Sequence, residues 1–91
     1  MITNMQSMFH NTRIFNMPIG AWDVSNVTNM RYMFKGTTDF NRPIGQWDVN
    51  NVMDMTGMFE KSFAFNQPLK WNYNTDIQKE GMFDGARRRE G

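Results

Sequence analysis

Cysteine is absent from this chain of 91 residues, so it has no disulfides, no thiolate nucleophiles and no zinc sites with cysteine ligands. Ten lysines and arginines against nine aspartates and glutamates give a net charge of +1. That charge is too small to attract nucleic acid or an anionic membrane over the whole surface. No apolar run approaches the roughly 20 residues of a membrane-spanning helix, and the opening residues lack the basic and apolar segments of a signal peptide. The composition predicts one small soluble domain without membrane insertion.

A repeat of about 25 residues runs through almost the whole chain. The stretch FNMPIGAWDVSNVTNMRYMF at 15–34 returns as FNRPIGQWDVNNVMDMTGMF at 40–59. Met-Phe pairs mark four copies, at 8–9, 33–34, 58–59 and 82–83. A period of this length is typical of solenoids, in which each unit buries its apolar face by stacking on its neighbours.

The first expected element of each unit is a short strand. Ile19, Trp22 and Val24 have the L-x-x-L-x-L spacing of leucine-rich repeats, which places Trp22 and Val24 on one face. Because equivalent residues of successive units stack, we expect Trp22, Trp47 and Trp71 to lie above one another in parallel strands.

The second expected element is a helix of about two turns. Its apolar residues fall at i, i+3, i+6 and i+7, namely Val27, Met30, Met33 and Phe34. Ser25 and Asn26 precede this stripe as N-cap candidates. Two positions after each Met-Phe pair stand Asn11, Gly36, Lys61 and Gly85. Three of these four tolerate the left-handed conformation that ends a helix.

These elements predict an α/β, leucine-rich-repeat-like solenoid of about three 25-residue units, each a short parallel strand plus a short helix. The expected units are 2–26, 27–51, 52–76 and a degenerate 77–86, followed by a basic tail at 87–91. Adjacent turns should be bridged by a ladder of side-chain amides from Asn16, Asn41 and Asn66. Met33 and Phe34 should be more buried than the Met-Phe pairs at either end.

Residues 8–30 read Met-Phe, five residues, then Phe-Asn-x-Pro-Ile-Gly-x-Trp-Asp-Val-Ser-Asn-Val-Thr-Asn-Met. This pattern resembles the repeat of the BspA-like leucine-rich-repeat surface proteins, closely over residues 2–71 and poorly over 72–86. The resemblance implies a solenoid on cell-surface or secreted proteins that contact host or matrix components, with no enzymatic activity. It supplies no ligand-binding residues to carry over. The chain itself shows no signal peptide or anchor, which favours a fragment of a longer surface-protein array.

The expected function is a non-enzymatic repeat module for protein–protein or surface interaction, without cofactor or metal. The alternative is a relic or small reading frame with only a structural role and no ligand. Solenoids present a repeated sheet face to ligands. The expected contact face is therefore Ala21, Asp23, Ser25, Gln46, Asp48, Asn50, Lys70, Asn72 and Asn74. Self-association through the N-terminal repeat edge is a further expectation, because that edge leaves apolar residues uncovered.

Other candidate chemistry has simpler explanations. His10 occupies a repeat position held by Lys35 and Glu60 elsewhere, which favours a solvent-facing side chain over a catalytic one. Asp23 and Asp48 could form acidic rungs for calcium, but the glycine-rich turns of such proteins are missing. The basic run at 87–89 lacks interleaved aromatics and favours a solvated tail over a nucleic-acid contact.

Overall fold

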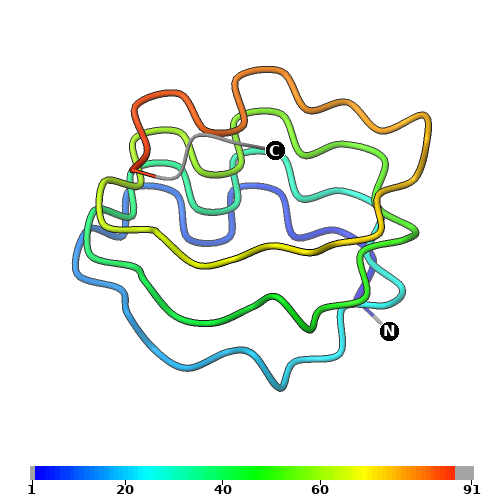
Figure 1. Cartoon of the computed structure of the whole chain (residues 1–91), viewed down its shortest axis with the longest axis horizontal. Coiled ribbons are helices and arrows are strands. Elements are labelled where there is room, and N and C mark those ends of the chain that lie inside the picture. Colours follow the sequence, from blue (N-terminus) through cyan, green and yellow to red (C-terminus); the bar gives the residue numbers. More distant parts are fainter. Residues whose placement is uncertain (1, 88–91) are drawn as a thin grey trace.

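The computed structural model describes residues 2–87, which wind into coils stacked one on the next (Figure 1). Isolated parallel bridges join Asn4 to Asn29, Asn29 to Asp54 and Asp54 to Gln78. Successive bridge residues are 25, 25 and 24 positions apart, which is the period of the repeat. Equivalent positions of the repeat therefore lie above one another, in a body of 27 × 24 × 21 Å.

The predicted α/β solenoid of strand-plus-helix units is wrong. Residues 2–87 contain no α-helix and no β-strand, and the isolated bridges are their only β-pairing. The bridge at Asn29 lies inside the stretch assigned to a helix, whereas the segment assigned to a strand around Trp22 has no bridge. Each coil is built from turns and irregular segments.

The expected helix is replaced by a run of tight turns (the stepped traces in Figure 1). Met33 N donates to Met30 O at 3.1 Å, which closes a β-turn of four residues, 30–33. The third residue of that turn, Tyr32, has a φ of 58°, as a type II turn requires and as a right-handed helix does not permit. Consecutive turns of this kind place apolar side chains three and four positions apart. That spacing imitates the period of a helix.

Two left-handed positions recur in all four coils. The first is occupied by Ser7, Tyr32, Gly57 and Gly81, and the second by Asn11, Gly36, Lys61 and Gly85. All eight have φ between 57° and 74°. The left-handed conformation expected two positions after each Met-Phe pair is thus confirmed, although no helix ends there. Ser25 and Asn26, expected as N-caps, lie in a turn instead.

Alternate backbone N–H groups of the turn run bond to the next coil. Met30, Tyr32, Phe34 and Gly36 donate at 2.8 to 3.0 Å to the carbonyls of Asp54, Thr56, Met58 and Glu60. The same four positions donate from the first coil to the second and from the third to the fourth. N–H groups between them close turns within their own coil. The buried backbone is therefore satisfied without a helix or a sheet.

Seven phenylalanines form two columns through the core. Ring centroids are 5.4 to 5.6 Å apart along the column of Phe9, Phe34, Phe59 and Phe83. They are 5.5 and 5.8 Å apart along the column of Phe15, Phe40 and Phe65. Within a coil the columns touch, with 4.5 Å between the centroids of Phe34 and Phe40. Each of the first three coils thus fills the same cross-section with the same pair of rings, and the fourth contributes Phe83.

The stacking predicted for the tryptophans is confirmed for one pair. The rings of Trp47 and Trp71 lie 6.3 Å apart and 5° from parallel. Trp47 Nε1 also donates to Ile19 O of the preceding coil at 3.2 Å. Trp22 belongs to the first coil and remains 39% exposed, with its ring centroid 5.8 Å from that of Phe9.

The predicted asparagine ladder is confirmed. Asn16 Oδ1 accepts a hydrogen bond from Asn41 N at 2.9 Å, and Asn41 Oδ1 accepts one from Asn66 N at 2.9 Å. The predicted burial gradient is confirmed as well, because Met33 and Phe34 have no exposed surface. The end pairs are less covered, with Met8 41% and Met82 3% exposed and with Phe9 and Phe83 half-buried.

Replacing Gly57 by alanine should destabilise the fold. The φ of Gly57 is +60°, and a Cβ there would lie 2.5 Å from a ring carbon of Tyr32. A left-handed alanine costs about 1–2 kcal/mol, and moving the ring adds to that cost. Lys61→Gly, at the other left-handed position of the same coil, should raise the free energy of unfolding by up to about 1 kcal/mol. Urea denaturation of the parent and both variants measures these opposite shifts. A Gly57→Ala protein as stable as the parent would contradict the turn geometry.

Candidate functional site

The contact face predicted from the sequence lies at the surface, although on turns and irregular segments and not on strands. Ser25 and Asn74 are half-buried. The other seven residues are exposed, namely Ala21, Asp23, Gln46, Asp48, Asn50, Lys70 and Asn72. These nine residues are called the polar row below.

Acidic side chains of the polar row hold its turns. Asp23 Oδ1 accepts hydrogen bonds from Ser25 Oγ at 2.6 Å and from Ser25 N at 3.0 Å. These two bonds lower the pKa of the Asp23 carboxyl below its usual range. Asp48 Oδ1 accepts a bond from Asn50 N at 3.1 Å. Both carboxylates therefore form Asx turns with their own backbone.

Side-chain amides tie the polar row together across coils. The bonds run from Asn51 to Ser25 O, from Asn74 to Asn50 O and from Gln46 to Gly20 O, at 2.8, 3.4 and 3.0 Å. Within residues 2–87 the side chains of Asn50, Lys70 and Asn72 form no hydrogen bond. The row is a fixed polar edge with few side chains left free for a ligand.

A charged cluster surrounds Tyr32 on the turn run. Arg31 pairs with Asp54 at 3.4 Å, and Lys35 pairs with Glu60 at 3.5 Å. Both cations also lie against the Tyr32 ring, 5.0 and 4.9 Å from its centroid. All four charged side chains are partly solvent-exposed, so water screens the pairs and each contributes little to stability. The cluster joins the second and third coils and balances its own charge.

Two opposing effects act on the pKa of the Asp54 carboxyl in this cluster. Burial raises the pKa of its carboxyl, but hydrogen bonds from the Thr56 hydroxyl and N–H and the charge of Arg31 outweigh that effect. The pKa of Asp54 therefore lies below its usual range.

Sequence reasoning missed a second surface, formed by Arg13, Ile14, Met17, Arg42 and Phe63 and called the exposed strip below. Ile14, Met17 and Phe63 are 87%, 61% and 57% exposed, and both arginines are exposed. A signal was available in the repeat. Ile14 stands where the second copy has Asp39, and Phe63 stands where it has Thr38. An apolar residue at a position that is polar in another copy is not required by the core.

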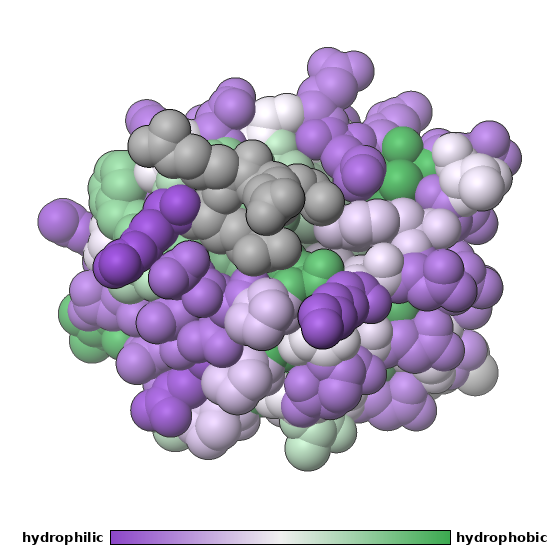
Figure 2. Space-filling model, in the orientation of Figure 1, coloured by the Kyte–Doolittle hydropathy of each residue, from purple (hydrophilic) through white to green (hydrophobic). Residues whose placement is uncertain are grey.

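Backbone contacts between coils bring the parts of the exposed strip near one another. Thr38 Oγ1 donates to Arg13 O at 3.0 Å, and Ala64 N donates to Thr38 O at 3.1 Å. Position 63 is therefore two coils from position 13 in the same column of the repeat. Arg42 Nε donates to Asn16 O at 2.8 Å, which places its guanidinium beside Met17. The face drawn in Figure 2 shows hydrophobic residues as separate groups in a largely hydrophilic surface.

The remaining candidates from the sequence are metal ligands, His10 and the basic run. Within residues 2–87 no three histidine, aspartate or glutamate side chains gather closely enough to hold a metal ion. That part of the chain also has no helix long and apolar enough to cross a membrane. His10 is exposed, with its ring centroid 6.5 Å from that of Tyr32. Of the basic run, Arg87 is exposed, and Arg88 and Arg89 lie outside the described residues.

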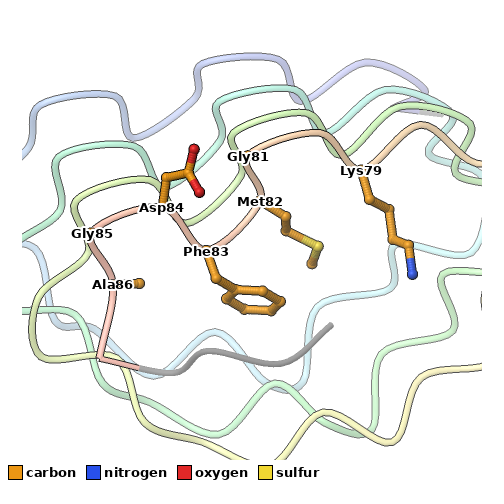
Figure 3. Close-up of a pocket in the computed structure, with 7 residues that line it drawn as sticks. All are labelled: Lys79, Gly81, Met82, Phe83, Asp84, Gly85 and Ala86. Carbon is orange, nitrogen blue, oxygen red and sulfur yellow. The ribbon is translucent and has the colours of Figure 1, made fainter.

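Two hollows open at opposite ends of the stack. The C-terminal hollow, of about 560 Å³, is lined by Lys79 and residues 81–86. Figure 3 shows the side chains of Met82 and Phe83 pointing to one side of the last coil and Asp84 pointing to the other. The N-terminal hollow, of about 240 Å³, is lined by Ile2, Met5, Met8, Trp22 and Asp23. Apolar side chains at both ends are thus incompletely covered.

The two carboxyl groups with lowered pKa predict acid sensitivity. A lowered folded-state pKa adds stability above the unfolded value of about 3.9 and loses it as the pH falls through the folded value. We expect the free energy of unfolding to fall between about pH 5 and pH 3. In the double variant Asp23→Asn/Asp54→Asn the amide oxygens keep the turns, as Asn29 does for Arg31 N, so the fall should be smaller. Urea denaturation across this range measures both slopes, and equal slopes would rule out these carboxylates as the cause.

Comparison with known proteins gives one family. The model described as "Mycoplasma protein of unknown function, DUF285" matches residues 1–90. No curated protein and no solved structure matches the chain. The match includes every coil of the stack, both hollows, the polar row and the exposed strip. The chain therefore belongs to the DUF285 family.

Proposed function

We propose that the chain is a non-enzymatic repeat module that binds a protein or cell-surface component through the exposed strip. The observation that carries this proposal is the exposure of the apolar side chains of Ile14, Met17 and Phe63 together with two exposed arginines, Arg13 and Arg42. Protein-binding surfaces are enriched in aromatic residues, methionine and arginine. Burying such side chains against a partner gains free energy that the isolated fold does not obtain from them.

The backbone beneath the exposed strip is held in place before binding. Asp39 N donates to Arg13 O at 3.1 Å, and Phe15 N donates to Thr12 O at 3.1 Å. These bonds fix both ends of the segment that carries Ile14. A surface that is ordered beforehand loses less conformational entropy on binding.

The polar row is the second candidate surface. Its residues repeat at the same positions of successive coils, so it suits a partner that is itself extended. Its carboxylates and most of its amides are already bonded to the backbone, however, which leaves the side chains of Asn50, Lys70 and Asn72 as its free polar groups within residues 2–87. By contrast, the apolar side chains of the exposed strip are not already bonded within the molecule.

The class of partner follows from the resemblance to BspA-like surface proteins. That resemblance favours host or matrix components, and display on a cell surface or secretion as part of a longer array. A purely structural role without any ligand is the alternative that an experiment must separate from it.

Binding to immobilised fibronectin, laminin and collagen, each measured by surface plasmon resonance, tests the proposal. We expect concentration-dependent binding to at least one of them. Phe63→Ser should weaken it by more than about tenfold, as loss of a central aromatic anchor does. Met53→Ser is the matched control, because Met53 is also exposed but lies outside both surfaces.

Lys70→Ala separates the two surfaces. If it abolishes binding while Phe63→Ser does not, the polar row is the contact face and the exposed strip is not. If the parent protein binds none of the three probes, the matrix-binding proposal is wrong and the structural role is favoured.

A further inference from the structure

The C-terminal edge of the stack presents backbone donors without acceptors. In each earlier coil, four alternate N–H groups bond to the carbonyls of the next coil. In the last coil the same four positions are Lys79, Gly81, Phe83 and Gly85. Within residues 2–87 none of these four N–H groups donates a hydrogen bond. An edge of this kind can pair with another chain.

The N-terminal edge presents the complementary acceptors. The carbonyls that receive bonds in the later coils correspond, in the first coil, to those of Asn4, Gln6, Met8 and His10. Among the described residues, none of these four oxygens accepts a hydrogen bond. The four donors and the four acceptors have the same alternate spacing. They match the pairing of Met55, Gly57, Phe59 and Lys61 with Gln78, Glu80, Met82 and Asp84 inside the molecule.

Side chains at the two edges fit the same register. Phe9 and Phe83 are the half-buried ends of one phenylalanine column, in which neighbouring rings lie 5.4 to 5.6 Å apart. His10 and Asp84 occupy the position at which Lys35 and Glu60 form an ion pair between adjacent coils. Stacking the first coil of one copy on the last coil of another would therefore continue the phenylalanine column. It would also place the imidazole of His10 beside the carboxylate of Asp84.

Met8 shows what kind of surface would cover the N-terminal edge. Its equivalents Met33, Met58 and Met82 are 0%, 0% and 3% exposed, whereas Met8 is 41% exposed. The difference is that each equivalent has a coil before it. The cover that Met8 lacks is thus another coil of the same kind.

From these matches we infer that a second copy of this chain docks head to tail, with its residues 2–11 on residues 78–86 of the first. The contact joins two different surfaces, so each added copy leaves a free edge at either end. Such a heterologous contact does not close and produces an open series of oligomers. The inference is independent of the exposed strip, which lies on the side of the stack.

Cysteine cross-linking tests the docking directly, because the natural chain has no cysteine. Adjacent coils place equivalent residues about 4.8 Å apart, which is within the range that a disulfide spans. A His10→Cys protein mixed with an Asp84→Cys protein should form a disulfide-linked heterodimer under mild oxidation. The rate should exceed that of His10→Cys mixed with Met53→Cys by about tenfold, because docking raises the local thiol concentration.

A double variant, His10→Cys/Asp84→Cys, should form a ladder of disulfide-linked oligomers on a denaturing, non-reducing gel. Lys35→Cys/Glu60→Cys is the positive control, since its disulfide forms within one molecule in the same register. Intrinsic tryptophan fluorescence of each variant confirms that the stack has folded. If heterodimers form no faster than with Met53→Cys, the docking is wrong. If His10→Cys instead links preferentially to itself, the contact joins two N-terminal edges and the head-to-tail arrangement is wrong.

Discussion

Stacking of phenylalanine rings between coils is the interaction on which the rest of the fold depends. Phe34, Phe40, Phe59 and Phe65 have no exposed surface. The first three lie against rings of the coils on both sides, and Phe65 lies against Phe40 of the preceding coil. In a domain of 91 residues few other contacts bury as much apolar area. The columns require equivalent residues to lie above one another, which fixes the register of every coil and explains why the sequence repeats.

The backbone follows from that register. Within the turn run, one N–H group bonds inside its coil and the next bonds to the neighbouring coil. This alternation satisfies the interior of the stack and leaves acceptors at one end and donors at the other. The sides and the ends of the molecule therefore differ in chemistry. The sides carry the exposed strip, through which we propose that a partner binds, and the polar row, whereas the ends carry backbone groups of the first and last coils that are unpaired within residues 2–87.

The repeat was sufficient to predict which residues of successive coils stack on one another. It did not predict the backbone conformation within a coil. Periodicity predicted the asparagine ladder and the burial of Phe34, because these depend on equivalent residues meeting. The asparagine and glycines after the Met-Phe pairs predicted one of the two left-handed positions of each coil. Periodicity failed at Met30 and Met33, where β-turns of four residues reproduce the spacing of a helix. The residue types at Tyr32 and Lys61 did not predict their positive φ, because tyrosine and lysine rarely adopt it. The repeat did not predict the exposed strip, because Ile14 and Phe63 stand at positions that do not recur as apolar residues in the other copies.

Scalar couplings across hydrogen bonds in isotope-labelled protein distinguish stacked coils from helical units most directly. Stacked coils predict a coupling between the N–H of Phe34 and the carbonyl of Met58, 24 residues later in the chain. They also predict one between the N–H of Tyr32 and the carbonyl of Thr56. A coupling between the N–H of Phe34 and the carbonyl of Met30, four residues earlier, would indicate an α-helix in this run. That result would contradict the stacked-coil fold and the edge complementarity inferred from it.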